Sequence, residues 1–334
     1  MVPFDDGWGS LDFEPPRLET VVTSEPARSL ISTNDSPDVP FEQSINPYKG
    51  CEHGCVYCFA RQTHPYLGLS AGLDFESKIF SKPNAPELLR RELAGKRYRC
   101  RVLVLGANTD PYQPVEKRLG LTRRILEVLR DHRHPVSVVT KSNLVLRDLD
   151  LLAAMAADRL ASVLVSVTTL DRELARRMEP RAPTPGRRLE TIRTLDDAGV
   201  PTGVLASPMI PGLNDAELDR ILEAAAVAGA SVAGTILLRL PHEVKDLFVA
   251  WLETHYPNRA KRVQRLLREA HDGKIYQAEW GRRMQGTGEY ADLLRRRFDL
   301  ACRRLGLDPC READLDVTRF RVPGRPGKQR RLFS

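Results

Sequence analysis

Short apolar runs alternate along this chain with longer segments in which apolar residues recur every three or four positions. The runs are rich in β-branched residues and predict buried strands, while the amphipathic segments predict helices that cover them. Strands are expected at 101–107, 135–140, 160–168, 200–210 and 231–240. Helices are expected between them at 118–132, 146–159, 187–199 and 214–229. This alternation is typical of a parallel sheet with helices on its outside.

A further strand is expected at Ser44–Tyr48, which brings the series to about six βα units. Six units are too few for an eight-stranded barrel and enough for a partial one. We therefore predict an α/β fold, a partial (β/α)6 TIM-like barrel, over residues 44–240. The pattern predicts an irregular acidic lead-in at 1–43, helices only at 241–315, and a basic flexible tail at 316–334.

Charge is unevenly distributed along the chain. The formal net charge is +7, yet residues 1–44 hold nine acids and two bases. Residues 259–304 hold thirteen Lys and Arg against six acids, and residues 318–334 hold six bases and no acid. A basic C-terminal half fits a polyanionic partner such as nucleic acid, but a solvated helix surface explains the same counts. The charge pattern leaves both interpretations open.

The apolar content and the cysteines indicate in which cellular compartment the protein is expected. No run of about 18 apolar residues predicts a membrane-spanning helix. The acidic N-terminus lacks the basic and apolar regions of a secretory signal, so we expect a cytoplasmic protein. Six cysteines in 334 residues do not make a disulfide framework. Unpaired cysteines close together indicate a metal or redox role.

Three of the cysteines stand within eight positions, in the segment Cys51-Glu-His-Gly-Cys55-Val-Tyr57-Cys58. The segment directly follows the first predicted strand, where reacting groups gather in parallel α/β folds. Thiolates suit an iron–sulfur cluster or zinc. Three thiolates on a four-iron cluster leave one iron free to bind something else. The alternative is a zinc site completed by His53, although that residue lies inside the loop.

This segment resembles the motif of the radical S-adenosylmethionine (SAM) enzymes, C-x3-C-x2-C with an aromatic residue before the last cysteine. The resemblance covers roughly residues 44–240 and implies a barrel of the radical SAM type with a helical C-terminal extension. It implies that the three cysteines hold a [4Fe-4S] cluster whose open iron chelates SAM. It further implies reductive cleavage of SAM to a 5′-deoxyadenosyl radical that takes hydrogen from a substrate. An electron donor such as flavodoxin or ferredoxin is also implied.

The turn after the second strand, residues 106–116, narrows the resemblance to one branch of these enzymes. It lacks the Gly-Gly-Glu sequence that many radical SAM enzymes carry there, and it looks like the branch that contains spore photoproduct lyase. In that branch this turn stands at the SAM amine, and residues at the ends of the next strands contact the SAM carboxylate. The cofactor contacts that the resemblance implies are Tyr57, Asn108, Thr109, Asp110, Lys141, Ser166 and Arg181.

The sequence also departs from that relative. Spore photoproduct lyase has a hydrogen-donating cysteine in the turn where this chain has Asn108. Cys100 stands at the opposite end of the strand and is interpreted as a small buried residue. Cys302 and Cys310 could donate hydrogen or hold a second cluster, but the signal is weak. Thymine-dimer reversal of that lyase's type is therefore not expected, and the catalytic residues stay unassigned.

The extreme C-terminus carries a separate hypothesis. Gln329, Leu332 and Phe333 resemble the pentapeptide by which bacterial replication and repair proteins dock on the DNA sliding clamp. Arg330 stands where that pentapeptide usually has an apolar residue. A frayed tail is the alternative.

Three functions follow from these observations. The first is a radical SAM enzyme that repairs or modifies nucleic acid by lyase- or transferase-type chemistry. The second is the same chemistry on a peptide or small metabolite. The third is a non-catalytic protein that binds an iron–sulfur cluster or zinc.

Overall fold

An open barrel of parallel strands forms the centre of the computed structural model, which describes residues 5–7, 19–309 and 314–324. Its sheet has the order β11-β10-β9-β8-β7-β6-β3-β2 within these residues. The six strands of the barrel wall are all parallel: β3 (Gln43–Ile45), β6 (Leu103–Leu105), β7 (Val136–Thr140), β8 (Ala161–Ser166), β9 (Thr202–Met209) and β10 (Val232–Leu237). The predicted partial (β/α)6 barrel is confirmed.

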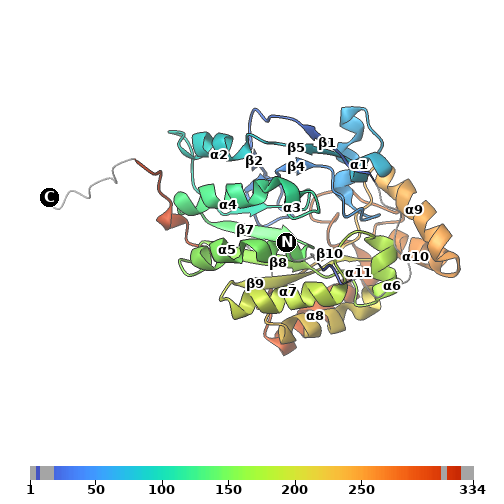
Figure 1. Cartoon of the computed structure of the whole chain (residues 1–334). Coiled ribbons are helices and arrows are strands. Elements are labelled where there is room, and N and C mark those ends of the chain that lie inside the picture. The colour runs from blue at the N-terminus through green and yellow to red at the C-terminus, as the bar shows by residue number, and fades with distance from the viewer. Residues whose placement is uncertain (1–4, 8–18, 310–313, 325–334) are drawn as a thin grey trace.

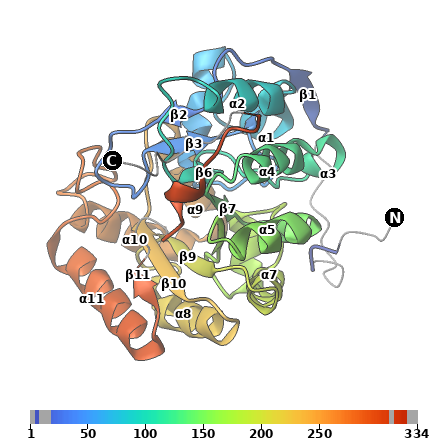
Figure 2. The same ribbon diagram turned by 90° about the vertical axis from the view of Figure 1, so that its left-hand side faces the viewer.

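Helices cover the outside of the barrel, as the alternating pattern predicted. Figure 2 shows α2, α4, α5, α7, α8 and α11 arranged in turn around the strands. Their bounds are α2 (Ala85–Leu93), α4 (Leu121–Asp131), α5 (Leu149–Ala156), α7 (Pro185–Asp197), α8 (Leu218–Val227) and α11 (Gly288–Leu305). The short helices are α1 (Leu73–Ser77), α3 (Glu116–Leu119) and α6 (Arg172–Met178). The expected helix at 118–132 is broken at Gly120, whose φ of +61° ends α3.

Successive side chains of each strand point alternately toward the helices and toward the inside of the barrel. Val136 and Val138 of β7 are fully buried in the main core cluster, and Val163 of β8 joins them. The intervening side chains are small and polar: Ser162 Oγ donates to Ser137 Oγ at 3.1 Å. The strands therefore present their apolar side to the helices and a more polar side to the inside of the barrel.

A second, smaller sheet lies beside the barrel. Its order is β1-β5-β4, formed by β1 (Val21–Ser24), β5 (Lys78–Ser81) and β4 (Tyr48–Lys49). The segment predicted to be an irregular lead-in thus contributes β1, and also β2 (Ser32–Thr33), which pairs antiparallel with β3. Both strands are short and largely exposed, so they leave no apolar pattern.

The expected C-terminal helices are α9 (Glu243–His255), α10 (Pro257–Glu269) and α11, followed by the short strand β11 (Asp308–Pro309). Figure 1 shows α9 and α10 side by side at one end of the barrel, and α9 contacts the 3-10 helix Phe59–Thr63. Their apolar residues Phe248 and Val263 belong to the same buried cluster as Cys55 and Tyr57. The helical region therefore packs on the cysteine loop itself. Within the described part of the chain, no helix is long and apolar enough to cross a membrane.

Residues 314–324 lie against the opposite end of the barrel. The Phe320 ring contacts those of Tyr98 and His134, with centroids 5.5 and 5.4 Å away. The Arg321 N–H donates to the carbonyl of His132 at 2.9 Å. Part of the predicted flexible tail is thus packed on the protein. The proposed clamp-binding residues, Gln329, Leu332 and Phe333, and the cysteine Cys310 lie outside the described residues.

Candidate active site

The cysteine loop begins after β4 and ends in a 3-10 turn at Phe59–Thr63. Main-chain bonds fix its path: the Cys51 N–H donates to the Phe75 carbonyl at 3.0 Å, and the Cys58 N–H donates to the Cys55 carbonyl at 3.2 Å. Gly54 lies in the left-handed region with a φ of +69°, and a Cβ there would meet the Arg181 guanidinium at 2.3 Å. Glycine is therefore required at the centre of the loop.

The three thiols of the loop form one donor set, in which Cys51 and Cys55 are buried and Cys58 is half-buried. Burial is the largest cause that raises the pKa of Cys51, Cys55 and Cys58, and it brings the pKa of Cys55 to about 12. Charge repulsion from Cys55 and Cys58 also raises the pKa of Cys51, because the three sulfur atoms are neighbours. Without metal the thiols stay protonated, and a bound metal supplies the positive charge that makes them thiolates. This soft donor set fits an iron–sulfur cluster.

The geometry does not support the zinc alternative. Among the described residues, no three His, Cys, Asp or Glu side chains converge on the position of a single metal ion. A four-iron cluster needs no such convergence, because each thiolate binds its own iron. His53 is buried at 2% exposure, and its Nδ1 lies 3.4 Å from Asp110 Oδ2. His53 therefore links the loop to the turn after β6.

Asp110 lies at the strand end where the sequence predicted it, but its oxygens are bonded within the protein. They accept hydrogen bonds from Thr140 Oγ1 and the Lys141 N–H, both at 2.7 Å, and from the Tyr112 N–H at 2.9 Å. Although burial alone would raise the pKa of Asp110, the His53 imidazole and these donors lower it. Asp110 thus ties the cysteine loop to the end of β7.

The other residues predicted after β6 and β8 also reach this end of the barrel. The N–H groups of Asn108 and Thr109 donate to Asn46 Oδ1 at 2.8 and 3.3 Å, and Thr109 Oγ1 donates to the Tyr48 carbonyl at 3.0 Å. The Asn108 side chain is exposed. Ser166 is buried at the last position of β8. Of this group, Asn108 has the side chain most open to a ligand.

A buried carboxylate that the sequence did not single out organises the floor of the site. Glu179 is fully buried, accepts from Thr168 Oγ1 at 2.8 Å and from the Tyr57 hydroxyl, and pairs with Arg188. Burial opposes its ionisation, but Arg188 and Lys141 outweigh burial and bring the pKa of Glu179 to about 2. Its charge and hydrogen bonds hold the aromatic residue of the cysteine motif in place.

Lys141 is a second cation beside this floor. Its Nζ lies 5.9 Å from the centroid of the Tyr57 ring. Burial opposes its charge, but attraction from Cys55 and Glu179 outweighs burial and raises the pKa of Lys141. No hydrogen bond or ion pair of the Lys141 ammonium is found among the described residues. Lys141 is therefore held in its charged form and is available to an anionic ligand, and its contact with SAM stays a prediction.

Two arginines and one glutamate, which we call the arginine clamp, hold the loop from its other side: Arg61, Arg181 and Glu76. The Arg61 guanidinium donates to four main-chain carbonyls at 2.9–3.0 Å, those of Gly54, Cys55, Ala71 and Gly72. Arg181 donates to the Glu52 carbonyl, and both arginines pair with Glu76. Arg181, which the sequence predicted at the SAM carboxylate, is thus already bonded to the cysteine loop.

Buried polar atoms without a partner occur at several places among the described residues, and three of them lie at or near the ends of barrel strands. These three are Asn143 Oδ1 after β7, Ser207 Oγ in β9 and Arg239 Nε after β10. Each such atom costs about 1–3 kcal/mol if it stays unpaired, so such atoms near the strand ends indicate a ligand site. A cofactor with an amine, a carboxylate and hydroxyl groups, as SAM has, fits these groups.

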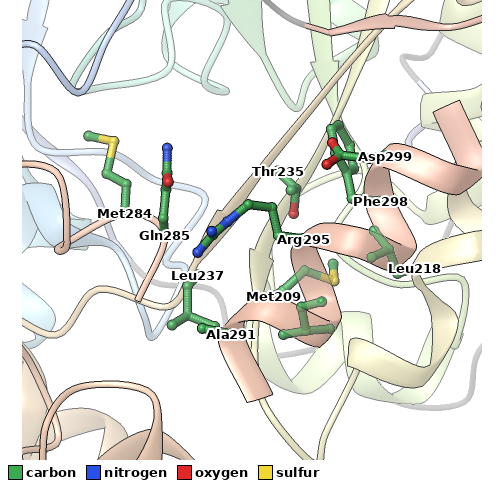
Figure 3. Close-up of a pocket in the computed structure, with 11 residues that line it drawn as sticks. Met209, Leu218, Thr235, Leu237, Met284, Gln285, Ala291, Arg295, Phe298 and Asp299 are labelled. Carbon is green, nitrogen blue, oxygen red and sulfur yellow. The ribbon is translucent and has the colours of Figure 1, made fainter. Parts of the chain in front are cut away.

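The cavity drawn in Figure 3 lies elsewhere. It has a volume of about 250 Å³ and lies between α11 and the ends of β9 and β10. Met209, Leu237 and Phe298 give it an apolar lining, and Arg295 reaches across it. None of the three loop cysteines lines it. This cavity is therefore separate from the cysteine loop.

Comparison with known proteins agrees with the geometry. The model of the radical SAM superfamily matches residues 45–225. An uncharacterised protein of Mycobacterium tuberculosis is 38% identical over 232 residues, which cover 69% of this chain and 68% of the relative. An uncharacterised protein of Methanocaldococcus jannaschii is 33% identical over 174 residues, which cover 52% of this chain and 62% of the relative.

Solved structures share the fold. Spore photoproduct lyase complexed with dinucleoside spore photoproduct matches with a TM-score of 0.61 at 17% identity, covering 86% of this chain and 81% of that chain. A variant of that lyase with bound AdoMet and the dinucleoside matches with a TM-score of 0.60 at 18% identity, with the same coverage. These structures show the shared fold, while the family model and the mycobacterial relative show the family. The chain therefore belongs to the radical SAM superfamily, whose enzymes use a [4Fe-4S] cluster and SAM.

Proposed function

We propose that this enzyme acts on nucleic acid. The observation that carries the proposal is the surface of α10, which exposes five cations: Arg259, Lys261, Arg262, Arg265 and Arg268. Within the described residues, only Arg265 among them has an ion-pair partner, Glu269 at 3.2 Å. A helix face of unpaired cations is the electrostatic footprint of a phosphate-backbone site.

The opposite face of α10 connects this surface to the cysteine loop. Ala260, Val263 and Leu267 are buried in the cluster that also contains Cys55 and Tyr57. The helix that carries the exposed cations therefore packs with its inner face in the same apolar cluster as the cysteine loop. The related fold of spore photoproduct lyase, whose structure contains a dinucleoside lesion, is in keeping with a nucleic-acid substrate.

The residues of the site can be given roles under this proposal. Cys51, Cys55 and Cys58 would hold the cluster. When bound, the cluster and SAM supply reductive cleavage of SAM and removal of a hydrogen atom from the substrate. The Lys141 ammonium would donate a charge-assisted hydrogen bond to the SAM carboxylate. Asn108, at the turn after β6, would face the SAM amine, while an electron donor such as flavodoxin or ferredoxin would reduce the cluster.

The test uses two variants with the same loss of charge. The first replaces the four unpaired cations of α10, Arg259, Lys261, Arg262 and Arg268, by glutamine. The control replaces Arg90, Arg91, Lys96 and Arg97, which are also exposed and have no ion pair among the described residues. Binding of fluorescent single-stranded DNA and RNA is measured by anisotropy over a range of salt concentrations. Release of 5′-deoxyadenosine by the anaerobically reconstituted enzyme is followed with and without nucleic acid.

The wild type should bind with an affinity that falls steeply with salt. Each lost phosphate contact lowers the salt slope by about 0.7 on a single strand, so the α10 variant should lose up to about 3 units. The control variant should bind like the wild type. Absence of wild-type binding at low salt, or equal weakening in both variants, would contradict the proposal.

A further inference from the structure

Arg239 is a second cation at the mouth of the barrel that has no anionic partner. Its Nε is buried, and within the described residues the guanidinium has no ion pair or hydrogen bond. Its central carbon lies 4.9 Å from the centroid of the Phe59 ring. Phe59 directly follows Cys58, and Arg239 follows β10, the last strand of the barrel wall. Arg239 therefore lies next to the cysteine loop.

The main chain around Arg239 is firmly held. Leu238 and Leu240, its two neighbours, are buried in the cluster that contains Cys55 and Tyr57. The Leu238 N–H donates to the Met209 carbonyl at 3.0 Å, which fixes this segment to the end of β9. Stacking on an aromatic face further restricts the guanidinium. Arg239 is thus preorganised, and little entropy is lost when it binds a ligand.

An unpaired, partly buried guanidinium indicates an anionic ligand. The planar fork of arginine matches the oxygens of phosphate or carboxylate in two parallel hydrogen bonds. SAM has one carboxylate, and Lys141 stands ready for it beside Tyr57. The SAM carboxylate thus has a partner in Lys141, and Arg239 is free to bind a different anion.

We propose that Arg239 binds a phosphate of the substrate strand, next to the nucleotide that reacts. This inference rests on the proposed function and specifies where the strand enters the site. Cations on α10 would hold the strand along its length, while Arg239 would fix one phosphate beside Phe59. The position of that phosphate would determine which nucleotide lies over the cysteine loop.

The experiment compares Arg239→Gln with Arg239→Lys in the reconstituted enzyme, and Arg91→Gln serves as the exposed control. The probe is a short fluorescent single-stranded DNA, used as such and in versions with one phosphate replaced by a neutral methylphosphonate at each position in turn. The dissociation constant of SAM is measured in parallel by equilibrium dialysis. Iron content and circular dichroism confirm that each variant is folded and loaded.

Arg239→Gln should weaken DNA binding roughly ten- to a hundredfold and lower the salt slope by about 0.7. SAM binding should stay unchanged, and Arg239→Lys should keep the salt slope. One methylphosphonate position should weaken binding to the wild type and not to Arg239→Gln. Wild-type DNA affinity in Arg239→Gln, or a loss of SAM affinity instead, would overturn the inference. A wild type that binds neither DNA nor RNA would overturn the proposed function itself, before any variant is compared.

Discussion

Replacing Glu76 by glutamine tests whether the arginine clamp shapes the cysteine loop. The Glu76 carboxylate pairs with both Arg61 and Arg181. Glutamine has nearly the same shape but no charge, so Glu76→Gln leaves two guanidinium groups without their counter-charge. Both groups donate to carbonyls of the loop, and a change in their position would alter the geometry of the three thiols.

The expected magnitude follows from burial. The side chains of Arg61, Glu76 and Arg181 are 3%, 11% and 23% exposed. Removal of one partner from a buried ion pair costs about 3–5 kcal/mol, because a charge stays buried without compensation. Arg181 reaches solvent in part, so we expect the lower figure, about 3 kcal/mol. If this cost is local to the loop, its open form becomes roughly a hundredfold more populated.

Two assays measure these effects. Urea unfolding of the anaerobic apo-protein gives the free energy of unfolding, and iron transfer to a chelator gives the lifetime of the cluster. The matched control is Glu173→Gln, which breaks the exposed i,i+4 pair between Glu173 and Arg177, at 72% and 36% exposure. Such a pair contributes about 0.3–0.5 kcal/mol.

The reasoning would be refuted by equal behaviour of the two variants. A Glu76→Gln protein that unfolds like Glu173→Gln and retains iron as long as the wild type would show that the clamp is energetically unimportant. Loss of stability with unchanged iron release would show that the clamp stabilises the fold without shaping the loop.

Three further changes have defined outcomes. Cys55→Ala should abolish the iron–sulfur absorbance after reconstitution, and retained iron would exclude Cys55 as a ligand. Lys141→Gln should raise the dissociation constant of SAM roughly ten- to a hundredfold at unchanged iron content, measured by equilibrium dialysis; a fall in iron content would instead place Lys141 among the supports of the loop. His134 is buried beside Tyr98 and His132, and burial lowers the pKa of His134 from 6.5 to about 4. The unfolded chain therefore binds the proton first, so up to about 3 kcal/mol of stability present above pH 6.5 is lost as pH falls toward 4. His134→Gln should flatten this part of the pH profile in urea unfolding, and an unchanged slope would contradict the assignment.

The barrel was predictable because its strands are buried on the helix side and carry β-branched runs. Val136–Thr140 and Ala161–Ser166 fall within the predicted strands for this reason. Val21–Ser24 was not predicted, since it is largely exposed and gains its structure by pairing with Lys78–Ser81, far along the chain. A strand that depends on a distant partner leaves little trace in its own sequence.

Site residues could be predicted where they have a fixed spacing in the sequence or directly follow a predicted strand. The three cysteines have a fixed spacing, and Lys141 directly follows a strand that a pattern can locate. Glu179 and Arg61 have neither property, because the sequence alone does not distinguish a buried carboxylate or arginine from a solvated one. Arg181 shows the same limit: its position near the site was predicted, but its bond to Glu76 depends on tertiary packing.

The balance of charge at the mouth of the barrel constrains what the enzyme binds. The two arginines of the clamp share one carboxylate, Glu76, and Arg188 is paired with Glu179, so each of these three cations has an anionic partner within the protein. Lys141 and Arg239 have no ion pair among the described residues, and they lie on different strands of the barrel. Buried cations of this kind persist where a ligand supplies the missing charge. The cluster with its three thiolates and the SAM carboxylate would supply part of this negative charge, and the planar Arg239 guanidinium remains suited to a phosphate. A neutral substrate would leave Arg239 unpaired in the complete complex, whereas a phosphodiester would neutralise it. The unpaired Arg239 guanidinium is thus in keeping with the proposed nucleic-acid substrate, and this observation does not involve the surface of α10.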